Sequence, residues 1–109
     1  MWLLKRAEHL SLEEFRRWWL DTHCHDVARA QAPYLRRYLV DVRVDSDDLA
    51  GKPALEPEWD GIAEQWFDNE AAFNAVYGRP STTREDTLAH TSRFQRLIVV
   101  ENEVPLYED

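Results

Sequence analysis

The pattern of hydrophobic and polar positions divides the chain into two similar halves, each of which runs from a strand through a helix into a second strand. The first half begins with the apolar run Trp2–Leu4, which Lys5 and Arg6 end. A short continuous run of this kind indicates a strand that is covered on both faces. A polar turn follows it.

A capping box marks the start of the first helix. Ser11 and Glu14 have the spacing at which the serine hydroxyl accepts from the Glu14 N–H while the Glu14 carboxylate accepts from the Ser11 N–H, so a helix is expected from Leu12 onward. The positions at helical spacing that form its inward stripe are Leu12, Phe15, Trp19, Thr22, His23 and Val27. The helix should stop by Ala32, because Pro33 disfavours helical backbone in the residue before it.

The period of the pattern changes to two between Tyr34 and Val44, which predicts a strand with one dry face. The dry face consists of Tyr38, Val40, Val42 and Val44, and the residues opposite are Leu39, Asp41 and Arg43. Residues 45–59 show no period and contain one glycine and two prolines. We therefore expect a long loop, and such loops often form the lid or rim of a site.

The second half repeats this order. Asp60–Phe67 alternates again, which predicts a third strand. One face carries Ile62, Glu64 and Trp66, and the other carries Ala63, Gln65 and Phe67. Asp68 or Asn69 can then cap a short helix that continues through Tyr77 and that Gly78 ends.

The pattern near the end of the chain predicts a further helix over Arg84–Phe94 and a final strand over the β-branched run Leu97–Val100. The complete order, β-α-β, loop, β-α-(α)-β, is that of an α+β ferredoxin-like fold built from split βαβ units, with a four-stranded antiparallel sheet. Helices cover only one face of such a sheet. In a single domain of residues 1–109, a second copy packed sheet to sheet would hide the other face, so we expect a homodimer that forms a dimeric α–β barrel.

Composition limits the classes of partner. The formal net charge of −8 and the absence of a basic stripe argue against binding to nucleic acid, and no Lys/Arg-rich helix suited to a membrane surface is present. The negative field favours neutral or hidden substrates over free polyanions. Cys24 is the single cysteine, so no internal disulfide can form, and no long apolar leader begins the chain; both features indicate the cytoplasm.

Three segments together resemble the EthD family of dimeric α–β barrels. They are the helix sequence Ser11–His23 with its aromatic pair and histidine, the strand entry Leu35–Tyr38, and the strand with the start of the next helix, Asp60–Asp68. The resemblance extends over nearly the whole chain. It implies the dimeric barrel fold and a histidine that lies at the pocket.

Within that family the chain is more weakly similar to the muconolactone-processing members, typified by the 4-methylmuconolactone methylisomerases. The resemblance implies matching roles for His23 and Tyr38, and extends to His90. Two positions depart from it. His25 stands where family members commonly have a proline, and Gln65 replaces a cysteine of the methylisomerases.

His23 and Tyr38 are the candidate catalytic pair. His23 lies on the apolar stripe, where it is either a core histidine bonded to a backbone carbonyl or a pocket imidazole that moves protons near pH 7. Tyr38 begins the dry face of its strand, where its ring either fills the core or donates to a carbonyl or enolate oxygen. The family resemblance favours the pocket for His23.

Four further residues are candidates for substrate binding, namely Trp19, Glu64, Trp66 and His90. Glu64 lies between two large apolar neighbours on its strand face and is either a tuned acid or a partner in a salt bridge at a rim or dimer interface. His90 shares a helix face with Phe94 and is either a second pocket imidazole or a surface residue.

No metal site and no cofactor are expected. On a helix, His23 and His25 point about 200° apart and cannot coordinate one metal ion together. Cys24 is best interpreted as a buried thiol. The chain has neither a glycine-rich phosphate loop nor a serine nucleophile elbow.

The leading functional hypothesis is a small cofactor-independent enzyme of catabolism or secondary metabolism. It would catalyse proton transfer next to a carbonyl (isomerisation, dehydration or decarboxylation) on a lactone or another small hydrophobic or aromatic-derived compound. One alternative is a non-catalytic accessory protein that binds a hydrophobic ligand in an oxygenase degradation pathway. Another is a cofactor-free monooxygenase of the same fold.

Overall fold

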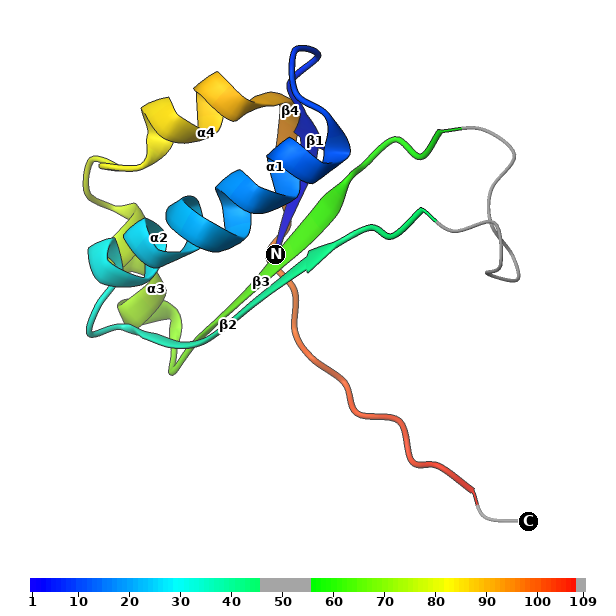
Figure 1. Cartoon of the computed structure of the whole chain (residues 1–109). Helices are drawn as coiled ribbons and strands as arrows, with labels where there is room; N and C mark the ends of the chain where they lie inside the picture. The colour runs from blue at the N-terminus through cyan, green and yellow to red at the C-terminus, as the bar shows by residue number, and fades with distance from the viewer. Residues whose placement is uncertain (46–55, 108–109) are drawn as a thin grey trace.

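One antiparallel sheet with helices on a single face makes up the fold (Figure 1). A computed structural model describes residues 1–45 and 56–107. The strands are β1 (Trp2–Arg6), β2 (Leu35–Val42), β3 (Gly61–Phe67) and β4 (Thr91–Arg96), in the spatial order β2-β3-β1-β4. This order confirms the expected α+β ferredoxin-like arrangement of split βαβ units.

The first helical layer begins at the predicted capping box. The Glu14 N–H donates to Ser11 Oγ at 3.1 Å, and the Ser11 N–H donates to Glu14 Oε1 at 3.0 Å. From there the chain runs without a break through α1 (Leu12–Trp18), the π-helical segment η1 (Trp19–His23) and α2 (Cys24–Ala30). The start and end of this helix confirm the prediction.

The π-helical segment in its middle was not predicted. The Cys24 N–H bonds to the carbonyl of Trp19, five residues back. In a regular α-helix, side chains four positions apart are rotated by about 40° relative to each other around the helix axis. The wider π-helical turn compensates for this rotation. The side chains that stay buried on one face as a result are Phe15, Trp19, His23 and Val27. Thr22, which was expected on the same stripe, is exposed and donates its hydroxyl to the Trp18 carbonyl at 2.7 Å.

The hydrophobic core lies between this helix and the sheet. Its buried centre consists of Leu4, Phe15, Trp19 and Ala63. Tyr38, Val40 and Val42 pack against that centre, as the predicted dry face of β2 requires, whereas Val44 lies beyond the strand and is exposed.

Gly61 allows the closest approach of helix and sheet. A Cβ atom built on this residue would lie 2.5 Å from Cζ3 of Trp19 and 2.8 Å from the backbone oxygen of Asp41. Any side chain here would displace the indole, so glycine at this position allows Trp19 to pack directly against the backbone of the sheet.

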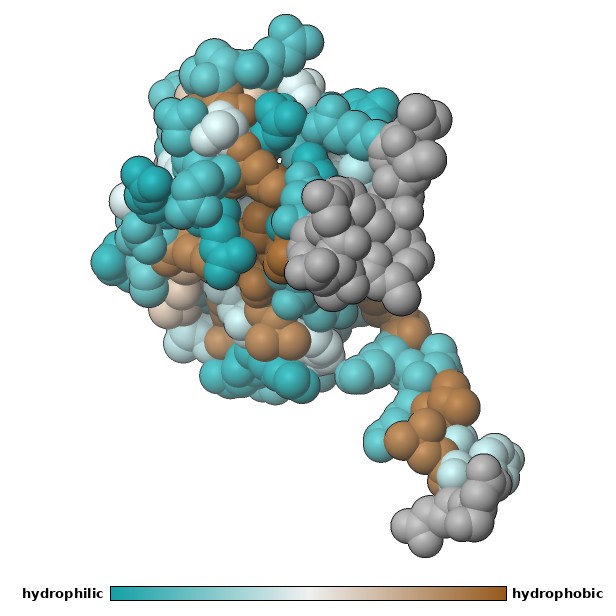
Figure 2. Space-filling model, turned by 45° about the vertical axis from the view of Figure 1, so that its right-hand side comes forward, coloured by the Kyte–Doolittle hydropathy of each residue, from teal (hydrophilic) through white to brown (hydrophobic). Residues whose placement is uncertain are grey.

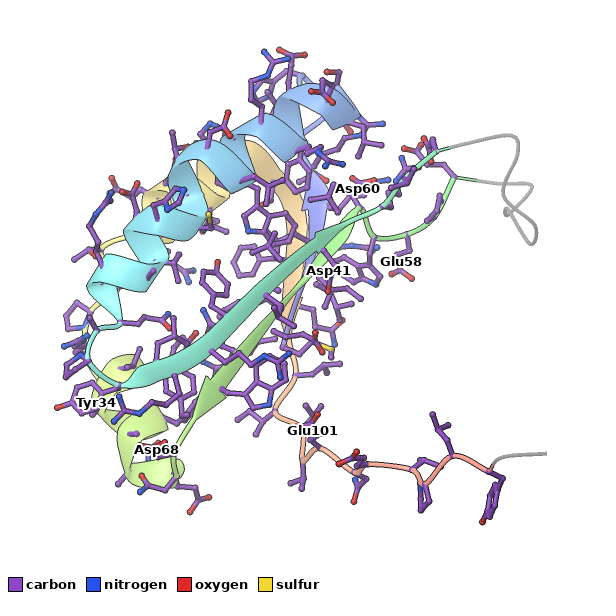
Figure 3. The ribbon with its side chains drawn as sticks, turned by 60° about the horizontal axis from the view of Figure 1, so that its bottom comes forward. Tyr34, Asp41, Glu58, Asp60, Asp68 and Glu101 are labelled. Atoms are coloured by element: carbon purple, nitrogen blue, oxygen red, sulfur yellow. The ribbon has the colours of Figure 1, made fainter. Side chains whose placement is uncertain are left out.

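A buried carboxylate holds the strand ends at the other side of the core. Asp60 is fully buried, accepts from the Arg6 N–H at 2.8 Å and from Arg43 Nε at 2.7 Å, and lies at the start of β3 (Figure 3). Burial alone would raise the pKa of Asp60, but these hydrogen bonds outweigh it and hold the pKa below its usual value.

The second half contains two short helices, α3 (Glu70–Tyr77) and α4 (Arg84–His90). Asn69 caps α3 by accepting from the Ala72 N–H at 2.9 Å, and Gly78 ends it, so both predicted boundaries of this helix are confirmed.

The end of the chain corrects two predictions. The helix expected over Arg84–Phe94 ends at His90, and the final strand is Thr91–Arg96 rather than Leu97–Val100. Pairing with β1 decides the boundary, since Phe94 lies opposite Leu4 and Arg96 opposite Trp2. The Leu97 N–H donates to the Met1 carbonyl at 2.8 Å, one residue beyond the end of β4.

The residues after Leu97 form an extended tail that leaves the sheet (Figure 1). Apolar side chains recur along it (Figure 2), and Ile98 and Val100 are 73% and 84% exposed. Most of the long loop predicted over 45–59 lies outside the described residues. Within the residues that the structure describes, no helix is long and apolar enough to cross a membrane.

Candidate functional site

A cavity of about 330 Å³ lies between the helical layer and the sheet. Its volume is at the lower end of the roughly 300–1,000 Å³ typical of small-molecule sites. Three of the residues singled out from the sequence, Trp19, His23 and Tyr38, line it together. The long helix supplies the first two and β2 supplies the third, so the cavity forms where the helix crosses the sheet.

His23 is buried and held by a carboxylate from α4. Its Nδ1 lies 2.8 Å from Oδ2 of Asp86, 63 residues later in the chain. A carboxylate can only accept, so Nδ1 carries the hydrogen and Nε2 is the nitrogen left for other partners. A core histidine at this position was expected to bond to a backbone carbonyl. A carboxylate takes that place, which fixes the tautomer and the orientation of the imidazole.

Thr87 provides a partner for the other ring nitrogen. Its Oγ1 lies 3.3 Å from His23 Nε2 and 3.1 Å from the Thr83 carbonyl. When Nε2 lacks a proton, the hydroxyl can donate to it; when Nε2 carries one, the hydroxyl can accept and donate to Thr83 instead. Rotation of one hydroxyl therefore satisfies both protonation states of His23.

Trp18 is sandwiched between two imidazoles. Its ring stacks on His23 at 4.5 Å and on His90 at 4.4 Å between centroids. The indole N–H also donates to both carboxylate oxygens of Asp86 at 3.1 Å. These contacts fix Asp86 in the position from which it orients His23.

His90 supports this cluster from outside the cavity. Its Nδ1 lies 2.7 Å from the Asp86 backbone oxygen, one helical turn earlier, and 3.2 Å from Oδ1 of the same residue. His90 does not line the cavity itself. Its contacts make it a residue that positions Asp86 and Trp18 rather than one that touches a ligand.

Tyr38 faces the same cavity as a hydrogen-bond donor. Burial raises the pKa of Tyr38 to about 12. The phenol therefore keeps its proton at neutral pH, and it can donate to an oxygen atom of a bound molecule.

A second phenol anchors the far wall of the cavity. The hydroxyl of Tyr77 accepts from Trp2 Nε1 at 3.1 Å and from Gln31 Nε2 at 3.2 Å, and donates to Oε1 of Gln65. These three bonds satisfy the hydroxyl fully. The buried Oε1 of Gln31 has no hydrogen-bond partner among residues 1–45 and 56–107, so this oxygen is available to accept a hydrogen bond.

Glu64 and Trp66 lie on the opposite face of the sheet. Alternation along β3 points them away from Ala63 and Gln65, which do line the cavity. The Trp66 ring lies 4.8 Å from the Arg37 guanidinium, and its indole N–H donates to Glu101 of the tail at 3.2 Å. The structure therefore does not bring either residue to His23 and Tyr38.

The two other residues discussed as ligands or nucleophiles are also separate from the cavity. His25 is exposed, so its imidazole points away from that of His23. Cys24 donates its thiol to the Leu20 carbonyl at 3.2 Å, and burial raises the pKa of that thiol, which makes it a weak nucleophile. In the described part of the chain no three His, Cys, Asp or Glu residues are grouped so that they could hold a metal.

Sequence reasoning missed the carboxylate and the hydroxyl that complete the site, Asp86 and Thr87. One signal was present: Asp86 precedes His90 by four residues, so the two share a helix face. The contact with His23 is tertiary, and nothing in the local pattern predicts it.

The comparison with protein families agrees with this architecture. The model of the EthD domain matches residues 7–94, which include both catalytic candidates and Asp86. A search of curated protein sequences found no match to the chain.

Proposed function

The chain belongs to the EthD family, and from the residues that meet in its cavity we propose that it is a cofactor-independent enzyme that moves protons on carbon next to a carbonyl. The observation that carries this proposal is the Asp86–His23 pair, with Nδ1 2.8 Å from the carboxylate, facing the cavity that Tyr38 also lines. An oriented base and an oxygen-directed donor are the two groups that enolisation requires.

His23 acts first as the general base. Its Nε2 takes a proton from the carbon next to the carbonyl, and the electron pair of that bond moves onto the carbonyl oxygen to form an enolate. Asp86 stabilises the imidazolium that results, because Nδ1–H already donates to it. Tyr38 donates to the enolate oxygen from its protonated phenol.

The second step returns the proton. When imidazolium Nε2–H delivers it to a different carbon of the enolate system, the product is an isomer. When Nε2–H instead protonates a hydroxyl group on the β-carbon, the enolate electron pair forms the new double bond as the C–O bond breaks, water leaves, and the reaction is a dehydration. Thr87 can hold Nε2–H between the steps by accepting from it. A small lactone or an aromatic-derived carbonyl compound fits the cavity volume and its apolar walls.

Deuterium exchange tests the proposal without knowledge of the natural substrate. A five-membered β,γ-unsaturated lactone in D₂O is incubated with the protein, and exchange and double-bond migration are followed by NMR. We expect His23→Gln to slow the exchange by about 100-fold or more. His25→Gln, which removes an exposed imidazole two residues away, serves as the matched control and should leave the rate unchanged.

The alternatives give different outcomes in the same assay. Binding of the lactone with no exchange above the uncatalysed rate supports the accessory role and contradicts the proposal. Oxygen uptake with an electron-rich phenol, again without exchange, supports a cofactor-free monooxygenase.

We also propose that the chain acts as a homodimer that packs sheet to sheet. The helices cover one face of the sheet, and the other face carries the apolar side chains of Leu3, Ile62 and Leu39; Leu39 is exposed in a single copy and the other two are half-buried. The tail residues Leu97–Val100 are also exposed. A second copy would cover both surfaces.

Sedimentation measurements test the dimer. Trp66→Glu introduces a charge on the sheet face and should shift the protein to a monomer, whereas Leu88→Glu places the same charge on exposed α4 and should leave a dimer. A wild-type monomer at micromolar concentration would contradict this proposal.

A further inference from the structure

The charged side chains that line the cavity have one sign. They are Arg79, Arg84 and Arg96, here called the arginine rim because all three are exposed at the cavity's edge. No aspartate or glutamate lines the cavity among residues 1–45 and 56–107. In a chain with 21 acidic and 13 basic residues, this local excess of positive charge is opposite to the overall balance.

Arg96 lies over aromatic rings rather than beside a carboxylate. Its guanidinium carbon is 5.1 Å from the centre of the Tyr77 ring and 5.7 Å from that of Trp2. Within the described residues it forms no ion pair, whereas Arg93 on the same strand pairs with Glu58 at 2.6 Å, and Arg43 just after β2 pairs with Asp60 at 2.7 Å. The N–H groups at the edge of the Arg96 guanidinium are therefore available to donate to another partner.

The other two arginines come from the segment after α3 and from the first residue of α4. Arg79 follows α3 and donates Nη2 to the carbonyl of Ala30 at the end of α2, which positions its side chain. Arg84 begins α4 and has no carboxylate within ion-pair distance in the described part of the chain. Each guanidinium has five donors, so most donors of the rim are available to a ligand.

We propose that the cavity takes a small substrate that bears a carboxylate, which the arginine rim binds while the apolar body packs against Trp19, Val27 and Phe94. This inference rests on the proposed function for the chemistry at the other end of the cavity, where His23 and Tyr38 act on the carbonyl. It also revises the expectation, drawn from the net charge, that the protein favours neutral substrates. The local field of the lining residues has the opposite sign to the field of the whole chain.

The geometry of guanidinium groups supports a carboxylate over other anions of similar charge. A guanidinium binds a carboxylate through two parallel hydrogen bonds, which gives orientation as well as affinity. A carboxylate held at the rim would place the rest of a one-ring molecule deeper in the cavity. The site would then bind an acid in a single orientation, with its carbonyl carbon near Tyr38.

A matched pair of probes tests the inference without turnover. Benzoate and benzamide have nearly the same shape but differ by one negative charge, and Trp2 and Trp19 in the cavity wall report binding through their fluorescence. We expect the wild-type protein to bind benzoate roughly ten-fold more tightly than benzamide at low ionic strength, with a preference that falls as salt is added.

The double variant Arg84→Gln/Arg96→Gln should bind both probes about equally, because only the rim distinguishes them. Arg16→Gln removes one positive charge from the exposed face of α1, away from the cavity, and should keep the full preference. The inference is overturned if benzamide binds the wild-type protein as well as benzoate does. It is also overturned if Arg16→Gln abolishes the preference to the same degree, or if benzoate shows no binding up to about 10 mM.

Failure of this inference differs from failure of the proposed function. If a neutral lactone exchanges in a His23-dependent manner and benzoate is not preferred, the inference of a carboxylate-bearing substrate fails and the proposed enzymatic function stands. If benzoate is preferred in an arginine-dependent manner and no substrate exchanges, the proposed enzymatic function fails and the carboxylate site stands.

Discussion

His23 Nδ1 lies 2.8 Å from Oδ2 of Asp86, and this one contact joins the two βαβ halves of the chain at the wall of the cavity. The first half contributes the imidazole from the long helix, and the second contributes the carboxylate from α4. Trp18 and His90 hold the carboxylate in place. The site therefore depends on how the halves pack together as well as on each half.

Tyr38 should make the protein sensitive to alkali. Its pKa is raised by burial from 10.0 to about 12 in the folded state. In the unfolded state the phenol ionises first, so the contribution to stability is present below pH 10 and is lost as the pH rises toward 12. The loss should approach about 1.4 kcal/mol for each pH unit in that window.

Urea unfolding at pH 9, 10 and 11 measures this effect. Tyr38→Phe should weaken the dependence, whereas Tyr34→Phe, at a site on the surface, should retain it. The interpretation of Tyr38 as a buried phenol is wrong if both variants follow the same curve. In the exchange assay Tyr38→Phe should lower kcat by about 100-fold, because the enolate loses its donor.

Asp60 should make the protein sensitive to acid. Its folded pKa lies below its usual value, so the contribution to stability is present above the unfolded pKa of about 3.9 and is lost as the pH falls through the folded value. Asp60→Asn leaves the Arg43 guanidinium without its buried partner and should cost about 3 kcal/mol of the free energy of unfolding at pH 7.

Asp68→Asn is the control for this charge. Its ion pair with Arg36, at the other end of β3, is exposed on both sides (Figure 3), and its loss should cost less than about 1 kcal/mol. Equal losses of unfolding free energy in the two variants would show that the burial of Asp60 adds nothing to the stability that its ion pair contributes.

Gly61 should be coupled to Trp19. A methyl group on residue 61 would lie 2.5 Å from the indole, so Gly61→Ala should destabilise the protein by about 1–3 kcal/mol and displace a wall of the cavity. The smaller ring in Trp19→Phe should relieve that clash. A double-mutant cycle in urea is expected to give a coupling energy of about 1 kcal/mol or more, and purely additive effects would contradict the close contact.

Local patterns predicted the elements whose boundaries local interactions decide. The Ser11 capping box and the period of two along β2 and β3 are examples, because hydrogen bonds and alternation within a few residues determine them. The end of α4 was missed because pairing between Phe94 and Leu4 fixes it, and those residues are 90 positions apart.

The same distinction applies to the site. The inward direction of His23 and Tyr38 follows from the face on which each lies, and both do line the cavity. The role of Asp86 depends on a contact across 63 residues. The arginine rim likewise depends on tertiary packing, because it combines Arg79 after α3 with Arg84 of α4 and Arg96 of β4. Glu64 and Trp66 were assigned to the cavity although their own alternation with Gln65 points them to the other face.

The exchange rate of the lactone in Asp86→Asn tests the His23–Asp86 pair most directly. An asparagine amide can donate to Nδ1, which would favour the tautomer with hydrogen on Nε2 and leave no base facing the cavity. We expect a fall in kcat of about 100-fold or more with KM little changed. The control Asp26→Asn removes an exposed carboxylate on α2 and should leave the exchange rate of the lactone at the wild-type value. An Asp86→Asn protein that is as active as the wild type would contradict the assignment of this pair as the proton carrier.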